Sequence, residues 1–188
     1  MEIYVIADTH FYHNNIIKYC DRPFEDVEKM NELIINKWNS VVSNEDIVLH
    51  LGDFGFGSKE QLTNICQQLN GYKILLKGNH DLRKGNGFFI DCGFQEVYKN
   101  KEMLLTEILG IPQDFIKTDS DVILSHYPRV VPNDKLNIHG HIHNAPLDIN
   151  QFNQDNHICV SIEMINYEPV SLIKIVEEWR DKYERRTS

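Results

Sequence analysis

The sequence predicts one α/β domain over residues 1–188, on three observations. Short apolar runs typical of buried strands alternate along the chain with apolar positions at helical spacing. Several of the apolar runs end in a cluster of polar residues. A chain of 188 residues that is 41% hydrophobic can bury one substantial core and is short for two. Strand, helix and strand in this order favour right-handed βαβ units, with a functional site along one edge of the sheet.

The first half of the chain gives the clearest elements. We expect buried strands at residues 2–7, 47–51 and 72–76. A short helix is expected within residues 13–20, and a helix of about four turns should begin near residue 26. The apolar face of that second helix recurs at gaps of three and four and comprises Val27, Met30, Ile34, Trp38 and Val41. Ser58 followed by Gln61 is a capping-box signature that predicts a third helix, ended by Asn70-Gly71.

The second half is less regular. Gly85-Asn86-Gly87 is expected to be a turn, residues 88–92 a short helix or a loop, and residues 94–105 one or two strands. Residues 106–120 leave helix, insertion and loop open. Further strands are expected at residues 121–125, at residues 136–138 and from residue 158 to residue 164. A last helix should follow Pro169, with its apolar positions at Leu172, Val176, Trp179 and Tyr183.

Composition excludes several classes of protein. With 19 Lys plus Arg against 28 Asp plus Glu, the net charge of −9 argues against a protein held on long nucleic acid or on an anionic membrane. No apolar run has the length of a signal peptide or a membrane span, so we expect a cytoplasmic protein without a membrane partner. The four cysteines are widely spaced and form no Cys-x-x-Cys pair, which favours neither a zinc ribbon nor a disulfide scaffold.

Candidate metal ligands occur in five clusters, most of which follow a predicted strand. These clusters are Asp8-x-His10, Gly52-Asp53, Gly78-Asn79-His80-Asp81, the single His126 and Gly140-His141-Ile142-His143. Carboxylate, imidazole and amide oxygen together form a mixed ligand set that suits divalent manganese, iron, zinc, cobalt or nickel. Two such ions about 3.5–4 Å apart can clamp the attacking and leaving oxygens of a phosphoryl transfer. Asp53 is the isolated carboxylate that could bridge them.

The five clusters resemble the pattern of the calcineurin-like metallophosphoesterases: D-x-H, G-D, G-N-H-[DE], a lone His and G-H-x-H. All five blocks are present without substitution and span about three quarters of the chain, from Asp8 to His143. The opening from Asp8 to Phe24 further resembles a small bacterial and phage branch of that superfamily. The resemblance implies a four-layer α/β/β/α sandwich with two mixed β-sheets. It also implies a dinuclear metal-dependent phosphoesterase that attacks phosphodiesters or phosphomonoesters with a water or hydroxide held between the metals.

Residue by residue, the resemblance implies that Asp8, His10 and His143 hold one metal ion. It implies that Asn79, His126 and His141 hold the other and that Asp53 bridges the two. Manganese is the first expectation, with iron, zinc, nickel and cobalt as alternatives, because these ligands suit all of them. His80 would face the substrate and would either donate a hydrogen bond to a phosphate oxygen or protonate the leaving oxygen, and Asp81 would orient His80.

Other residues near the clusters have two readings each. His139 is expected to support the site through hydrogen bonds and not as a ligand. His13 either faces the substrate or is part of the loop structure, and Arg22 either contacts phosphate or is an exposed turn residue. Candidate substrate contacts are therefore His13, Arg22, Asn79 and His80.

The expected substrate is a small phosphoester or a nucleotide, because a chain this short leaves little material for a cap domain. The oligomeric state is left open. Two other functions compete with this interpretation: a catalytically silent binding module of the same fold, and a nuclease that acts on short nucleic acid.

Overall fold

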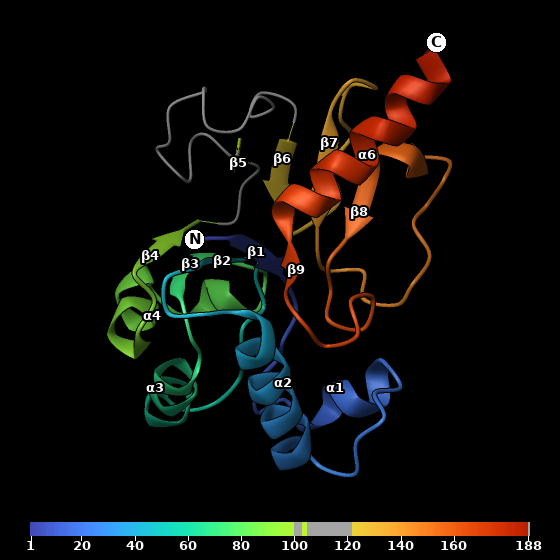
Figure 1. Cartoon of the computed structure of the whole chain (residues 1–188). Coiled ribbons are helices and arrows are strands. Elements are labelled where there is room, and N and C mark those ends of the chain that lie inside the picture. The colour runs from blue at the N-terminus through green and yellow to red at the C-terminus, as the bar shows by residue number, and fades with distance from the viewer. Residues whose placement is uncertain (100–102, 105–121, 188) are drawn as a thin grey trace.

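Two β-sheets face each other in the centre of the molecule (Figure 1). The structure is a computed structural model, and it describes residues 1–99, 103–104 and 122–187. The first sheet has the strand order β4-β3-β2-β1-β9. Its strands are β1 (Ile3–Ile6), β2 (Ile47–His50), β3 (Tyr72–Leu76), β4 (Glu96–Tyr98) and β9 (Val170–Ser171). All neighbours in it pair in parallel except β9, which is antiparallel to β1.

The second sheet has the order β5-β6-β7-β8. Its strands are β5 (Met103–Leu104), β6 (Val122–Ser125), β7 (Leu136–His139) and β8 (His157–Cys159). β5 is antiparallel to β6, whereas β6, β7 and β8 are parallel to one another. Both sheets are therefore mixed, as the resemblance implies.

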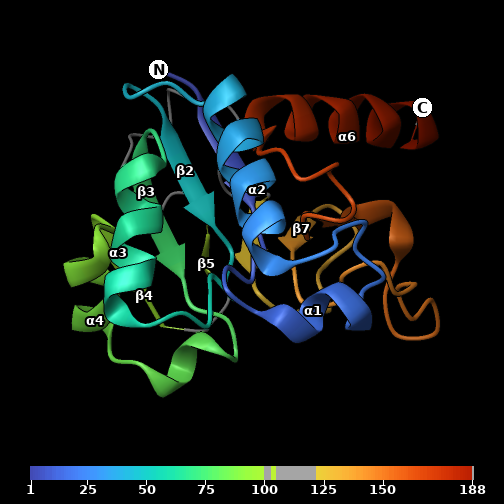
Figure 2. The same cartoon turned by 90° about the horizontal axis from the view of Figure 1, so that it is seen from below.

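Helices cover the first sheet on its other face. The described helices are α1 (Asn14–Tyr19), α2 (Val27–Val41), α3 (Lys59–Gln68), α4 (Asn86–Cys92) and α6 (Leu172–Thr187), with single 3-10 turns at Asp81–Arg83 and Gln154–Asn156. α2, α3 and α4 lie on the same side of the first sheet (Figures 1 and 2). Their apolar faces, such as Trp38 of α2 and Leu62 of α3, share a core with Val48 of the sheet. The predicted cap of α3 is present, because Ser58 and Gln61 exchange both hydrogen bonds of the capping box.

A second core fills the space between the two sheets. Val5 and Leu49 of the first sheet meet Leu124 and Ile138 of the second, and Trp179 of α6 joins the same cluster. α6 lies on the opposite side of the molecule from α3 and α4 (Figure 1). The result is the predicted α/β/β/α arrangement, held by two separate apolar cores.

The arrangement brings the carboxyl ends of strands from both sheets to one place. β1, β2 and β3 are parallel in one sheet, and β6, β7 and β8 are parallel in the other. The sheets are joined at these ends by a parallel bridge between Ala7 and Ser161. In this bridge the Ala7 N–H donates to the Val160 carbonyl at 2.9 Å, and the Ile162 N–H donates to the Ala7 carbonyl at 3.1 Å. Loops from six strands therefore surround one region.

Several element predictions are confirmed and two are wrong. Asn86 lies in the first turn of α4 and not in a turn between elements, because the N-cap is one residue earlier, at Gly85. The strand expected to reach residue 164 ends at Cys159, because the chain beyond it pairs with Ala7 and then turns. Residues 106–120 lie outside the described part of the chain. None of the described helices is long and apolar enough to cross a bilayer.

Candidate metal centre

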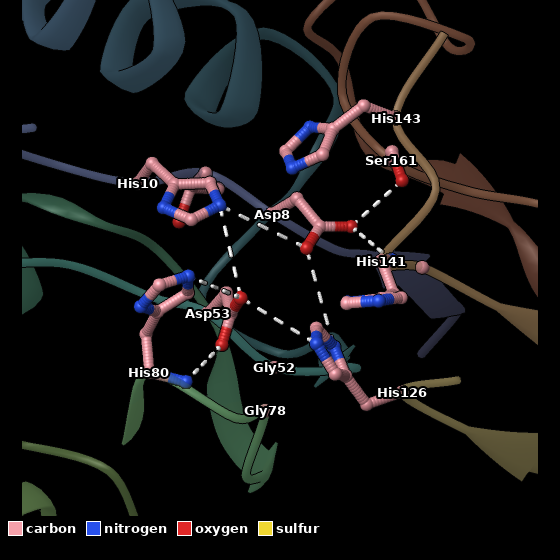
Figure 3. Close-up of polar contacts among 12 residues, drawn as sticks. Asp8, His10, Gly52, Asp53, Gly78, His80, His126, His141, His143 and Ser161 are labelled. Carbon is pink, nitrogen blue, oxygen red and sulfur yellow. Dashed lines mark hydrogen bonds and ion pairs between the residues drawn. The ribbon is translucent and has the colours of Figure 1, made fainter. Parts of the chain in front are cut away.

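Side chains of Asp8, His10, Asp53, His80, His126, His141 and His143 lie around one space at the carboxyl ends of the strands (Figure 3). Among the described residues, three groups of potential ligand atoms have all their members within 4.8 Å of one another, and two of these groups are made up of predicted ligands. One group is Asp8, His10 and His143, and the other is Asp8, Asp53 and His126. Side chains that are far apart in the sequence are therefore close enough to bind the same metal ion.

Asp8 lies at the middle of the centre and uses its two carboxylate oxygens differently. Oδ2 accepts hydrogen bonds from the His141 N–H at 2.8 Å and from the Ser161 hydroxyl at 2.7 Å. Oδ1 is buried and has no hydrogen-bond partner among the described residues. A buried carboxylate oxygen without a partner is costly, so this atom is placed for a ligand that the chain does not supply.

Three histidines use one ring nitrogen for support and turn the other toward the centre. His126 Nδ1 lies 2.9 Å from the Leu51 carbonyl, which leaves Nε2 at 3.4 Å from Asp53 Oδ2. His143 Nδ1 lies 3.0 Å from Glu163 Oε1. His10 Nδ1 contacts His13 Nδ1 at 3.3 Å, and its buried Nε2 has no hydrogen-bond partner among the described residues. This division is typical of metal-binding imidazoles, whose second nitrogen is held by a partner.

Asp53 stands between the two predicted ligand sets. Its Oδ2 lies 3.8 Å from His10 Nε2 and 3.4 Å from His126 Nε2, which belong to different predicted metal ions. Its Oδ1 accepts the His80 N–H at 2.9 Å. The position of Asp53 is therefore compatible with the bridging role that the resemblance implies.

Asn79 and His141 complete the second predicted set. Asn79 Oδ1 lies 2.9 Å from His126 Nε2. The His141 ring centroid is 5.1 Å from that of His126 and 4.2 Å from that of Tyr127. His141 is not a member of either close ligand group among the described residues, so it lies at the margin of the centre.

The backbone at the predicted ligands is strained. Five of the seven have a positive φ: Asp8 at 58°, His10 at 50°, Asp53 at 57°, His141 at 71° and His143 at 52°. L-residues other than glycine rarely adopt this left-handed conformation, and each instance costs about 1–3 kcal/mol. Such strain clusters at functional sites, where the surrounding structure enforces it.

Glycines in the clusters let the loops approach closely. A Cβ atom on Gly140 would overlap the Asp8 carboxylate, and one on Gly78 would overlap the Asp53 carboxylate. Gly140 does not have a positive φ, so its backbone conformation does not require glycine. Glycine fits at this position because the Asp8 carboxylate occupies the space that a Cβ atom would need.

The electrostatics of the centre fit bound cations. Burial raises the pKa of Asp8 and lowers the pKa of His10. The site therefore disfavours an ionised Asp8 that lacks a cation, and it also disfavours a protonated His10. A divalent cation would compensate the buried carboxylate and would bind the neutral imidazole. Two carboxylates, four imidazoles and one amide oxygen are therefore a donor set that fits divalent metal ions.

Two role predictions are wrong in this structure. Both Asp81 oxygens accept backbone N–H groups, those of Asp53 and Gly78 on Oδ2 at 2.7 and 2.9 Å and that of Phe54 on Oδ1 at 3.2 Å. Asp81 thus shapes the loops that carry Asp53 and Asn79, and it does not orient the His80 ring.

Arg22 is the second correction. Neither reading of Arg22 holds, because its side chain is fully buried and donates to Glu163 and to the Asp8 and Thr9 carbonyls. Its guanidinium cannot contact a substrate in this position, and it is not an exposed turn residue.

His80 and His13 lie at the open side of the centre. The His80 side chain is 41% exposed, with Nε2 3.9 Å from Asp53 Oδ2. His13 stacks on Phe56 with 3.9 Å between ring centroids, and Phe56 lies 4.9 Å from the His80 ring. An aromatic wall of His13, Phe56 and His80 thus borders the centre.

Two further histidines support the loops from inside. His139 is buried, and its Nδ1 lies 2.9 Å from the Gly140 carbonyl beside the predicted ligands. His50 is also buried, between the Thr9 hydroxyl and the Gly52 N–H. Neither belongs to a close ligand group of the described residues.

Sequence reasoning missed Ser161, Glu163 and Phe56. Ser161 and Glu163 follow β8 in the same way that the other clusters follow their strands, but extending the predicted strand to residue 164 hid them. Phe56 follows the Gly52-Asp53 cluster and carries no pattern of its own.

The chain is similar to a known family and to individual known proteins. The sequence model of the family described as calcineurin-like phosphoesterase matches residues 1–184. The chain is 38% identical over 184 residues to the uncharacterized protein MJ1445 of Methanocaldococcus jannaschii, covering 94% of this chain and 92% of that protein. It is 24% identical over 177 residues to the Gene 66 protein of Mycobacterium phage L5, covering 84% of each.

A solved structure is also similar. The crystal structure of AQ665, a protein of unknown function from Aquifex aeolicus, matches with a TM-score of 0.67 and 26% identity, covering 94% of this chain and 98% of that one. The fold is thus metallophosphoesterase-like along nearly the whole chain.

Proposed function

The chain belongs to the calcineurin-like phosphoesterase family, and from this premise we propose that it is a dinuclear metal-dependent hydrolase of phosphoester bonds. The observation that carries the proposal is the pair of buried atoms Asp8 Oδ1 and His10 Nε2, which lack a hydrogen-bond partner among the described residues. Both belong to close groups of ligand atoms that include Asp53 or His143. Hydrolysis in such a site needs no side-chain nucleophile.

In this proposal Asp8, His10 and His143 hold one ion, Asn79, His126 and His141 hold the other, and Asp53 bridges them. Support for the first set comes from the close group of Asp8, His10 and His143. Support for the second comes from the 2.9 Å contact of Asn79 Oδ1 with His126 Nε2, and support for the bridge from the position of Asp53 between His10 and His126. Manganese is the first candidate metal, and iron, zinc, nickel and cobalt suit the same ligands. When bound, the ions would polarise the phosphoester and make water a stronger nucleophile.

His80 is the proposed proton donor. Its backbone N–H donates to Asp53 Oδ1, and its imidazole, which is 41% exposed, has Nε2 at 3.9 Å from Asp53 Oδ2. From the rim it can donate to a phosphate oxygen or protonate the leaving oxygen.

The proposed substrate is a small phosphoester or a nucleotide with a planar group. Arg22 is buried and occupied, so it offers no contact to a phosphate. The stacked pair of His13 and Phe56 instead presents aromatic surface beside the centre, and Phe56 is 40% exposed. Aromatic surface favours an aryl or nucleobase group on the substrate. The net charge of −9 gives no basis for a long nucleic acid partner.

Hydrolysis of bis-p-nitrophenyl phosphate and of p-nitrophenyl phosphate tests the reaction. The metal-free protein should be inactive, and added manganese or another divalent ion should restore turnover. A screen of nucleotides and cyclic nucleotides would then identify the substrate. Protein shown to contain two ions that cleaves none of these esters with any metal would contradict the proposal and favour a binding role.

A further inference from the structure

A buried ion pair lies directly behind the candidate metal centre. Arg22 and Glu163 are far apart in sequence, yet Nη2 and Nε of Arg22 lie 2.7 and 2.8 Å from Glu163 Oε1. The side chains are 0% and 6% exposed, so solvent does not weaken their interaction. Burying two charges is costly, so this pair is weak evidence for stability, and what else its two members contact decides its role.

The carboxylate of this pair holds a predicted metal ligand. Glu163 Oε1 also accepts from His143 Nδ1 at 3.0 Å. A proton on Nδ1 leaves the lone pair of the neutral ring on Nε2, the nitrogen that faces Asp8 and His10 (Figure 3). Glu163 therefore selects both the tautomer and the orientation of His143.

The guanidinium of the pair holds a second predicted ligand through its backbone. Arg22 Nη2 donates to the Asp8 carbonyl at 2.8 Å, and Nη1 donates to the Thr9 carbonyl at 3.1 Å. Asp8 and His143 both have a positive φ, so their backbones need enforcement by neighbours. One planar group with donors in several directions can satisfy the carboxylate and both carbonyls at once.

We propose that Glu163 and Arg22 are positioning residues that build the metal position of Asp8, His10 and His143 from two distant parts of the chain. The inference rests on the proposed function, because it concerns the same metal centre. Cys20, His143 and Glu163 also lie within 4.8 Å of one another. Glu163 Oε1 already accepts from Arg22 and from His143, whereas Glu163 Oε2 is buried without a hydrogen-bond partner among the described residues. The experiment must therefore separate a positioning role of Glu163 from ligation of a further ion.

Calorimetric titration of Mn²⁺ into the metal-free protein tests the proposal without requiring turnover. Glu163→Gln keeps the size of the side chain and an acceptor oxygen for His143 but removes the charge. We expect the affinity for one of the two ions to fall about 10–100-fold, while the affinity for the other changes little. Glu168→Gln is the matched control, because Glu168 lies in the same segment and has no contact with the centre in any described interaction.

Arg22→Lys tests the other half of the pair. A lysine ammonium cannot reproduce the fork that joins Glu163 to the two carbonyls, so the same ion should bind more weakly. The double variant should lose less affinity than the sum of the two single losses, because the residues act through one network. Arg185→Lys, on the exposed surface of α6, should bind both ions like the wild type.

Three outcomes would overturn the inference. Wild-type affinity for both ions in Glu163→Gln would show that the pair does not position the site. A lower melting temperature of the metal-free variants with unchanged affinities would assign the pair to stability alone. A third bound ion that disappears in Glu163→Gln would make Glu163 itself a ligand. Failure of the proposed function is distinguishable, because it would appear as wild-type protein that binds no divalent ion or binds two and hydrolyses nothing.

Discussion

Single residues in the centre are held in conformations and spaces that ordinary protein structure avoids. Asp8 and His143 adopt positive φ angles, while Gly78 and Gly140 leave room for carboxylates. Each of these features costs stability or tolerance to mutation. Their concentration at one place is what distinguishes this centre from a chance group of histidines.

Replacement of His80 separates catalysis from metal binding. In His80→Asn the proton donor is lost while the proposed ligands remain, so kcat should fall about 10²–10⁴-fold with two ions still bound. Elemental analysis and steady-state kinetics on the same sample measure both quantities. His157→Asn is the control, because the ring nitrogens of His157 lie against the Asn153 and Arg129 carbonyls and its ring contacts His139 but none of the predicted ligands. Metal content and kcat lost in equal proportion would instead make His80 a ligand.

Gly140→Ala tests whether space beside Asp8 is required. The added methyl group would overlap the Asp8 carboxylate and the Ala7 side chain, both of which are buried. We expect a loss of about 1–3 kcal/mol in the free energy of unfolding, together with weaker Mn²⁺ binding.

Gly87→Ala is the matched control for Gly140→Ala, because a Cβ at Gly87 would meet nothing within 4 Å. Gly87 lies in α4, where alanine is the better helix former, so this variant should be as stable as the wild type or more stable. Urea unfolding and calorimetry compare the two variants. Equal free energies of unfolding and equal Mn²⁺ affinities in the two variants would mean that the Asp8 loop can move to make room for the added methyl group.

At the scale of elements, each ligand cluster follows a strand and each strand is supported by a helix or by the other sheet. β1 leads to Asp8, β2 to Asp53, β6 to His126 and β7 to His141. Parallel strands end at one edge, so similar loops from both sheets meet there. The same relation places Glu163 after β8.

The cap of α3 should contribute to stability without affecting the centre. Ser58→Ala removes the hydroxyl that accepts from the Gln61 N–H, which should cost about 1 kcal/mol. The urea midpoint should fall with an unchanged m-value, and Mn²⁺ affinity should stay the same. Ser40→Ala removes a hydroxyl that only donates back to the Lys37 carbonyl within α2, and it should change the stability by less than about 0.5 kcal/mol. Equal losses in both variants would mean that the capping box adds nothing.

At the scale of the whole molecule, the centre lies where the two sheets are joined. Protonation of buried groups there should therefore destabilise the packing of both sheets. His50 lies between these loops with Nε2 at 2.9 Å from the Thr9 hydroxyl and Nδ1 accepting from the Gly52 N–H. Burial lowers the pKa of His50 to about 3 from an ordinary value of 6.5. Protonation would place a second N–H against the Gly52 N–H, which explains why the folded protein keeps the ring neutral.

The pH dependence of stability follows from this shift. Because the folded pKa lies below the unfolded one, the unfolded chain binds more protons between pH 3 and pH 6.5. The contribution is complete above pH 6.5 and is lost as the pH falls toward 3. In metal-free protein, the melting temperature of His50→Gln should therefore fall less than that of the wild type when the pH is lowered from about 7 to about 4.5. Equal losses would assign the acid sensitivity to other groups.

The sequence by itself determined most elements of the first half of the chain and the list of candidate ligands. Periodicity located α2 and β1 to β3, and the capping box located the start of α3, because local spacing reflects which face of an element is buried. The resemblance on five short blocks implied the family and the layered fold, which the family match confirms. The ligand roles themselves stay predictions.

Only the tertiary structure decided how these residues act on one another. Asp81 and Arg22 turn to the backbone of the loops, and Glu163 reaches His143 from a segment that sequence reasoning read as strand. Hydrogen-bond partners such as Arg22 and Glu163 are set by the packing of two sheets and have no sequence spacing. Local patterns report the burial of an element's own faces, whereas contacts between distant loops depend on where the sheets place the strand ends.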